Sequence, residues 1–133
     1  MATTPPPTQG MHHIALNIID MDACLHFYKD LMGMQVEWQP DEDNIYLCSG
    51  TDNLALHRAE HDIERGKQSL DHLGFIMHEP DDVDRWFEHL SANGVKMLSE
   101  VKQHRDGARS FYCSDPDGNA VQMIYHPPIS VPA

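Results

Sequence analysis

Two histidines are the side chains of this 133-residue chain that are best placed to do chemistry. His13 opens the segment His13-Ile14-Ala15-Leu16, and His72 opens the similar segment His72-Leu73-Gly74-Phe75. An imidazole titrates near neutral pH and is a common metal ligand. If both segments are the first strands of two equivalent units, pseudo-symmetry brings His13 and His72 together. We therefore expect them to share one site.

The similarity continues beyond these segments and indicates an internal duplication. With the shift that places His13 on His72, Asp20 and Asp22 fall on Glu79 and Asp81, Phe27-Tyr28 on Trp86-Phe87, and Leu31 on Leu90. After a drift of a few residues, Tyr46-Leu47-Cys48-Ser49 matches Phe111-Tyr112-Cys113-Ser114. Order, residue type and spacing agree, so we expect one supersecondary unit to occur twice.

Each half predicts a strand, a helix and three further strands. In the first half these are a strand over Met11–Ile19, a helix over Ala23–Met32 that ends at Gly33, and extended segments over Met34–Gln39, Asn44–Cys48 and Asn53–Arg58. In the second half they are Leu70–His78, a helix over Pro80–Ala92, and Val95–Gln103, Arg109–Ser114 and Asn119–His126. The helix limits rest on acidic caps and on a terminal glycine.

These elements predict an α+β fold of two βαβββ modules whose cupped mixed sheets surround a cleft. The expected limits are a disordered lead over residues 1–10, modules over 11–58 and 70–127 within one domain, a linker over 59–69, and a tail over 128–133. Exposed edge strands would be covered if two such chains paired, so we expect a homodimer.

Alternation along the strands separates a helix-facing side from a cleft-facing side. The cleft-facing residues that we expect to matter are His13, Asn17, Ala55, His57, His72, Gln122 and Ile124. His12 is the alternative to His13, although alternation puts it on the helix side or at the exposed strand end. A histidine in a strand can also have only a structural hydrogen bond. We expect a surface position for His126, which lies beside Pro127-Pro128.

Composition excludes some partners. The net charge of −12 with neutral histidines repels phosphates, which argues against nucleic acid. No apolar run is long enough to span a membrane, and the first residues lack a signal-peptide pattern. Cys24, Cys48 and Cys113 lack metal-site spacing, so we expect reduced thiols and a cytoplasmic protein.

The chain resembles the vicinal oxygen chelate superfamily of glyoxalase I, extradiol dioxygenases and bleomycin resistance proteins. The resemblance rests on His13–Leu16, Phe27–Met34, Asp71–Phe75 and, most specifically, Ser110–Asn119. It implies a divalent metal in the cleft, with ligand positions at His13, Ala55, His72 and Gln122. Ala55 cannot ligate a metal, and Gln122 offers a neutral oxygen where a carboxylate is usual.

Two functions follow as expectations. The first is a small-molecule enzyme in which zinc, nickel, manganese or iron, bound by His13, His72 and weakly by Gln122, acts as a Lewis acid on a substrate with adjacent oxygen atoms. His57 would be the candidate base, or a third ligand of a shifted metal. The second is a metal-free small-ligand binding protein of the bleomycin-resistance type, favoured by the acidic charge and the missing carboxylates. No feature of the sequence favours a purely structural subunit.

Overall fold

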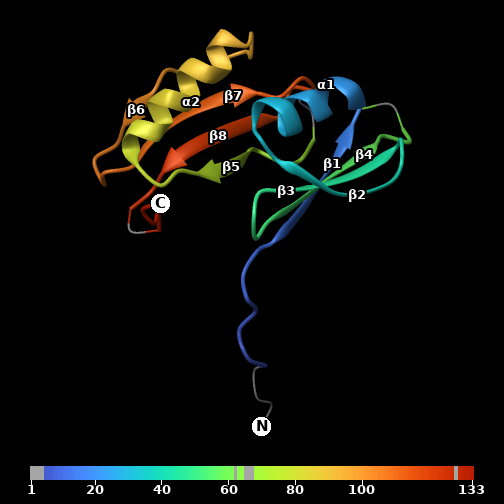
Figure 1. Cartoon of the computed structure of the whole chain (residues 1–133), viewed down its shortest axis with the longest axis horizontal. Helices are drawn as coiled ribbons and strands as arrows, with labels where there is room; N and C mark the ends of the chain where they lie inside the picture. Colours follow the sequence, from blue (N-terminus) through green and yellow to red (C-terminus); the bar gives the residue numbers. More distant parts are fainter. Residues whose placement is uncertain (1–4, 62, 65–67, 128) are drawn as a thin grey trace.

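Two four-stranded mixed sheets, one from each half of the chain, form the frame of the protein in a computed structural model (Figure 1). The structure describes residues 5–61, 63–64, 68–127 and 129–133. The strand orders are β1-β4-β3-β2 and β5-β8-β7-β6. In each sheet one pair of neighbouring strands is parallel, β1 with β4 and β5 with β8. The other neighbouring strands are antiparallel. The expected fold of two repeated modules with cupped mixed sheets is confirmed.

The element bounds follow the duplication. The first half contains β1 (His13–Ile18), α1 (Met21–Leu25), the π-helix η1 (His26–Leu31), β2 (Gln35–Asp41), β3 (Asn44–Cys48) and β4 (Asn53–Arg58). The second half contains β5 (Leu73–Ile76), α2 (Pro80–Ala92), β6 (Lys102–Gln103), β7 (Arg109–Ser114) and β8 (Ala120–Tyr125). The expected module limits, 11–58 and 70–127, stay predictions. Residues 1–4 of the lead, 62 and 65–67 of the linker and 128 of the tail lie outside the described residues.

The first helix differs from its prediction. A regular helix was expected over Ala23–Met32, but a short α-helix passes into a π-helix at His26. The amide of Met32 donates to the carbonyl of Phe27, five residues earlier, at 2.9 Å. Phe27 and its neighbour Tyr28 are both buried, and their rings meet edge to face. Both large side chains lie in the core within this wider helical turn.

The second half also departs from its prediction at the third strand. An extended segment was expected over Val95–Gln103, but only Lys102–Gln103 forms a strand, beside one isolated bridge at Met97. The amides of Leu98 and Ser99 both donate to the carbonyl of Tyr112, and the Ser99 hydroxyl accepts from the Tyr112 amide. The Ser99 side chain thus replaces a backbone carbonyl as the acceptor for Tyr112, and the regular hydrogen-bond ladder with β7 is interrupted.

The helices cover one side of the two sheets and leave the other side open (Figure 1). On β1 the buried residues are Leu16 and Ile18, while His13 and Asn17 are exposed. On β8 Val121 and Met123 are buried between partly exposed neighbours. The side of the sheets that carries His13 is called the open face below. No described helix is long and apolar enough to cross a membrane.

The turn at 115–118 joins the two halves. Asp117 accepts hydrogen bonds from the backbone amides of Ile19 and Asp20, at 2.5 and 3.1 Å. Asp115 accepts from the hydroxyl of Tyr28 and from backbone amides of its own turn. Both carboxylates are buried. A motif in the second half therefore supplies the acceptors for the corner between β1 and α1.

Candidate functional site

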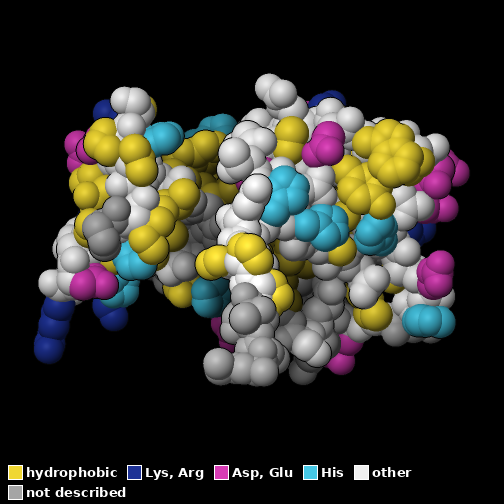
Figure 2. All heavy atoms as spheres, turned by 90° about the horizontal axis from the view of Figure 1, so that it is seen from below, with side chains coloured by type: hydrophobic (Ala, Val, Ile, Leu, Met, Phe, Trp, Pro, Cys, Tyr) yellow, Lys and Arg dark blue, Asp and Glu magenta, His cyan; other side chains and the backbone are white. Residues whose placement is uncertain are grey.

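His13, His72 and Gln122 line one pocket of about 380 Å³. The pocket lies where β1, β4 and β5 begin, and apolar side chains such as Leu54 and Phe75 contribute to its wall. In the view from below, histidine side chains lie on both halves of the molecule, several of them in a row on one half, and a hollow lies between the halves (Figure 2). The structure thus brings together the three residues at the expected ligand positions that have donor atoms.

His13 is held by an asparagine. Its Nδ1 lies 2.6 Å from Oδ1 of Asn53, which is its register partner on β4. The Nδ2 of Asn53 in turn donates to a carboxylate oxygen of Glu37 at 2.8 Å. Because Oδ1 accepts, Nδ1 of His13 carries the proton and Nε2 keeps a lone pair. His13 therefore presents Nε2 as its ligand atom.

His72 is held by a carboxylate. Its Nδ1 lies 2.7 Å from Oδ1 of Asp71, and its ring meets the ring of Tyr112 edge to face at a centroid distance of 5.3 Å. An ionised carboxylate can only accept, so Nδ1 of His72 donates the hydrogen bond. Its Nε2 is left with a lone pair, in the arrangement common to metal-bound histidines.

Gln122 lies beside a glycine on the neighbouring strand. Gly74 and Gln122 are register partners on β5 and β8. A Cβ atom at Gly74 would lie 3.3 Å from the Gln122 carbonyl oxygen and 3.6 Å from Oε1. A side chain at position 74 would therefore press on the Gln122 backbone carbonyl, whereas its contact with the amide oxygen would be an ordinary van der Waals contact.

His12 also lines this pocket, although alternation favoured His13. Its Nδ1 contacts the carbonyl oxygen of Thr51, and its own carbonyl accepts from the Asn53 amide at 2.8 Å. His12 lies just before the first strand, where strict alternation no longer applies. Asn53 and Glu37 were not predicted as site residues, and Asp71 entered only as part of a family motif, because single polar residues at strand ends carry no periodic signal.

His57 does not join His13 and His72 in this pocket. Along β4 it lies four residues beyond Asn53, a separation of about 13 Å. It lines a second pocket of about 350 Å³ together with Asn17. The shifted metal on His13, His57 and His72 is therefore not supported, because the strand carries His57 too far along the sheet.

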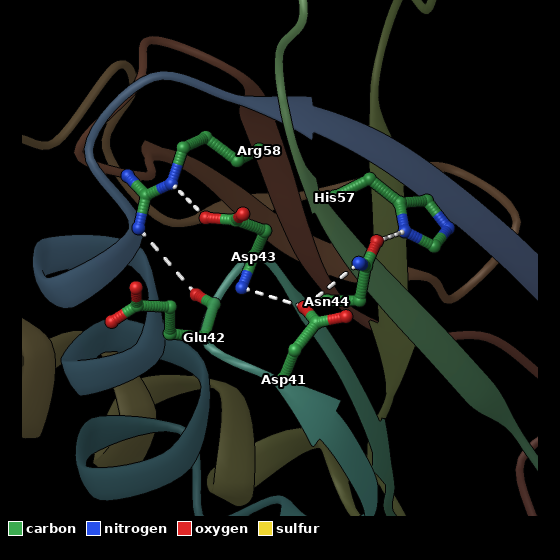
Figure 3. Close-up of polar contacts among 6 residues, drawn as sticks. All are labelled: Asp41, Glu42, Asp43, Asn44, His57 and Arg58. Atoms are coloured by element: carbon green, nitrogen blue, oxygen red, sulfur yellow. Dashed lines mark hydrogen bonds and ion pairs between the residues drawn. The ribbon is translucent and has the colours of Figure 1, made fainter.

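His57 has its own set of partners (Figure 3). Its Nδ1 lies 2.6 Å from Oδ1 of Asn44, whose Nδ2 donates to Asp41 at 2.9 Å. The Asp41 carboxylate accepts from the Asn44 amide, so the Asn44 oxygen faces His57 and accepts from its Nδ1–H. Nε2 of His57 therefore keeps a lone pair. In the same close-up, Arg58 binds the carboxylate of Asp43 and the carbonyl of Glu42. A basic neighbour thus partly compensates the acidic turn beside the histidine.

The other two expected cleft residues have different surroundings. Ala55 is fully buried, with an exposed fraction of 0%, so it contributes no open wall. It pairs with Tyr46 on β3, whose ring stacks on Trp38 at a centroid distance of 5.2 Å. Ile124 pairs with Ile76 and is half-buried on the second sheet. Trp38, Tyr46 and Ile76 give the open face an apolar character that the sequence analysis had not identified.

The two buried thiols do not take part in this chemistry. All three cysteines are free, and Cys24 and Cys113 are buried in the core. Burial, followed by the charge of Asp115, raises the pKa of the Cys113 thiol to about 12. Burial also raises the pKa of Cys24, as do the charges of Asp115 and Asp117. Both groups are neutral thiols at physiological pH, and thiolates are the form that ligates or attacks.

The pocket residues fit a divalent metal in part. Two imidazole nitrogens and one amide oxygen suit a transition-metal ion, although the set lacks the negative charge of a carboxylate. Within the described part of the chain, no three side chains among His, Cys, Asp and Glu are grouped to hold an ion. A metal here depends on the two histidines and on neutral oxygen donors.

Comparisons with known proteins agree on the family. Residues 10–123 match the family model described as the Glyoxalase/Bleomycin resistance protein/Dioxygenase superfamily. Metallothiol transferase FosB of Staphylococcus saprophyticus is 26% identical over 117 residues, which cover 86% of this chain and 76% of that protein.

Solved structures agree on the fold. A glyoxalase/dioxygenase from Nostoc punctiforme superimposes with a TM-score of 0.79 at 21% identity, over 96% of this chain and 97% of that one. Lactoylglutathione lyase from Agrobacterium tumefaciens gives a TM-score of 0.75 at 21% identity, over 90% and 96%.

Proposed function

Because the chain belongs to the glyoxalase/bleomycin resistance protein/dioxygenase superfamily, we propose that it is a metal-dependent enzyme acting on a small molecule. The observation that carries the proposal is the shared pocket of His13, His72 and Gln122, in which both histidines have Nδ1 engaged with an acceptor oxygen. The preferred substrate has adjacent oxygen atoms, and the metal is zinc, nickel, manganese or iron.

In this proposal the residues divide into ligands and supports. His13 and His72 would bind the ion through Nε2, and the Gln122 oxygen would be a weak third ligand. When bound, a divalent ion supplies Lewis-acid polarisation of the substrate oxygens. Asp71 fixes the ring of His72. Leu54 and Phe75 contribute an apolar wall to the pocket.

His57 is a candidate base under one condition. Its Nδ1 is engaged with Asn44, which leaves Nε2 for a substrate, and an imidazole side chain is a common general base. His57 lies about 13 Å along the sheet from the His13–Asn53 pair, so it cannot transfer a proton at a substrate atom next to the ion. His57 can act only on the far end of an extended substrate. The name of the Staphylococcus relative refers to thiol transfer, so small thiols belong in the substrate panel.

Metal analysis tests the proposal directly. The protein is purified without an affinity tag from metal-supplemented cultures, together with His13→Ala, His72→Ala and the control His26→Ala. His26 is an exposed histidine on η1, outside the proposed ligand set. We expect near-stoichiometric metal in the parent and in the control, and loss of metal in the other two. Metal retained by both site variants, or a metal-free parent, contradicts the proposal.

A second function is favoured by one observation, the aromatic stack on the open face. Trp38 is 59% exposed and rests on Tyr46, and Glu37 and Asp41 lie in the same strand. Such a surface suits a planar cationic ligand, in a metal-free binding protein. Quenching of tryptophan fluorescence by planar aromatic cations tests it. Trp38→Ala should abolish the response and Trp86→Phe on α2 should keep it, whereas equal quenching of both variants argues against a binding protein.

A further inference from the structure

Side chains from three strands form one hydrogen-bonded chain behind His13. His13 belongs to β1, Asn53 to β4 and Glu37 to β2. The two contacts are 2.6 Å from Nδ1 of His13 to Oδ1 of Asn53 and 2.8 Å from Nδ2 of Asn53 to Oε2 of Glu37. The chain crosses the sheet, since β3 separates β2 from β4.

The carboxylate at the end fixes the direction of every proton in this chain. An ionised Glu37 can only accept, so the Asn53 amide must turn its NH₂ group toward Glu37. The Asn53 oxygen then faces His13, and Nδ1 of His13 must donate. The tautomer of His13 is therefore set by a carboxylate that does not touch it.

A β-bulge brings Glu37 into reach. Val36 pairs with Leu47 and Trp38 with Tyr46, so β2 has one more residue than β3 between these pairs. In a regular strand, Glu37 and Trp38 would point to opposite faces. Here Glu37 contacts Asn53 and Trp38 stacks on Tyr46, both on the open face. Bulges of this kind redirect side chains near functional sites.

We propose that Asn53 and Glu37 are positioning residues that hold His13 as an Nε2 metal ligand. This inference rests on the proposed function for its metal, but not for its tautomer. Both duplicated histidines are expected to carry their proton on Nδ1, but their acceptors differ. His72 donates directly to the adjacent Asp71, whereas His13 donates to the Asn53 amide, which passes the hydrogen bond on to Glu37 and is called the amide relay. The relay substitutes for a carboxylate that the first half lacks at the position of Asp71, where it has His12.

The tautomer is measurable without metal. Long-range ¹H–¹⁵N spectra of labelled, metal-free protein at about pH 8.5, where free imidazole is neutral, distinguish a proton on Nδ1 from one on Nε2. We expect Nδ1–H for His13 in the parent. Asn53→Leu should move the proton to Nε2, and Asn53→Asp, which keeps an acceptor, should leave it on Nδ1.

Glu37→Gln provides a second variant at an exposed position that leaves the sheet intact. A glutamine can accept or donate, so the direction of the relay is no longer fixed. We expect both His13 tautomers to be populated. An unchanged His13 spectrum in Asn53→Leu and in Glu37→Gln overturns the relay.

Metal affinity completes the test with a matched control. Asn44→Leu removes the same type of amide relay, but from His57. Titration with zinc and nickel should show affinity about 10- to 100-fold weaker in Asn53→Leu, as expected for loss of an outer-shell partner, and unchanged in Asn44→Leu. Equal weakening in both variants overturns the positioning role. A parent that binds no metal contradicts the proposed function alone, since the metal-free spectra still decide the relay.

Discussion

The hydroxyl of Tyr28 donates a hydrogen bond of 2.7 Å to a carboxylate oxygen of Asp115, across a sequence separation of 87 residues. Both side chains are buried, so this contact joins the π-helix of the first half to the turn of the second inside the core. Asp115 also accepts from the amides of Asp117 and Asn119. The position of the turn depends on a tyrosine in the other module.

Removing the Tyr28 hydroxyl should therefore destabilise the protein. Tyr28→Phe keeps the ring but leaves a buried carboxylate with one partner fewer, and we expect a loss of about 1–3 kcal/mol in the free energy of unfolding. Urea denaturation followed by circular dichroism measures it. Tyr46→Phe, on the open face, is the control and should lie within about 0.5 kcal/mol of the parent. Equal stability of Tyr28→Phe and the parent would show that the contact contributes nothing.

Gln122→Glu should tighten metal binding. The two side chains are nearly isosteric, and a carboxylate neutralises part of the charge of a divalent ion while an amide does not. We expect affinity for zinc, nickel, manganese and anaerobic ferrous iron to rise by roughly tenfold or more. Gln35→Glu, an exposed change on β2 with the same charge difference, is the control. If both variants bind equally, Gln122 does not face the ion, and the pocket is better assigned to an organic ligand.

Alkaline pH should destabilise the fold through its buried thiols. The pKa of Cys113 is raised from 9.0 to about 12, mainly by burial, and that of Cys24 is raised as well. Above pH 9 the unfolded chain releases these protons and the folded chain keeps them, so the free energy of unfolding falls. The slope is on the order of 1 kcal/mol per pH unit for each thiol.

Urea midpoints between pH 8 and 10.5 test this dependence. A variant with Cys24→Ala and Cys113→Ala is less stable overall but should lose the thiol share of the slope. Cys48→Ala, at a partly exposed position, should keep it. The explanation fails if the double variant and the parent have the same slope.

Exposed edge strands should be covered by a second copy of the chain, as β2 with Trp38 and β5 with Ile76 lie at sheet edges. Trp38 and Ile76, with exposed fractions of 59% and 49%, are large apolar residues on the two sheets. We expect sedimentation at micromolar concentration to give twice the chain mass of 15.1 kDa. Ile76→Asp should shift the equilibrium toward the monomer, and Leu98→Asp, an exposed leucine outside the strands, should not. A parent that sediments only as a monomer refutes the homodimer.

Periodicity predicts regular elements well in this chain. The helix over Pro80–Ala92 was predicted with its observed limits, because proline, acidic residues and a terminal Asn93-Gly94 mark its ends. The open faces of β1 and β8 also followed from alternation. These signals are local, so the neighbouring residues alone carry them.

The irregular features could not be predicted from such local signals. The π-helix at His26 depends on the burial of Phe27 and Tyr28 against a distant turn, and the bulge at Glu37 depends on pairing with β3. His57 lies in a separate pocket because four residues of the extended strand β4 separate it from Asn53. Each is decided by tertiary contacts, which one sequence read segment by segment does not contain.

The hydrogen bonds of Asp117 have a consequence for the order of synthesis. The amide of Ile19 finds its acceptor 98 residues later in the chain. While a ribosome makes the protein, the corner between the first strand and the first helix emerges long before its buried acceptor exists. The N-terminal module can collapse early, but its corner gains this partner only after the turn at 115–118 is made. Ribosome-arrested chains that end before residue 115 should therefore expose that corner to proteases, and full-length chains should protect it.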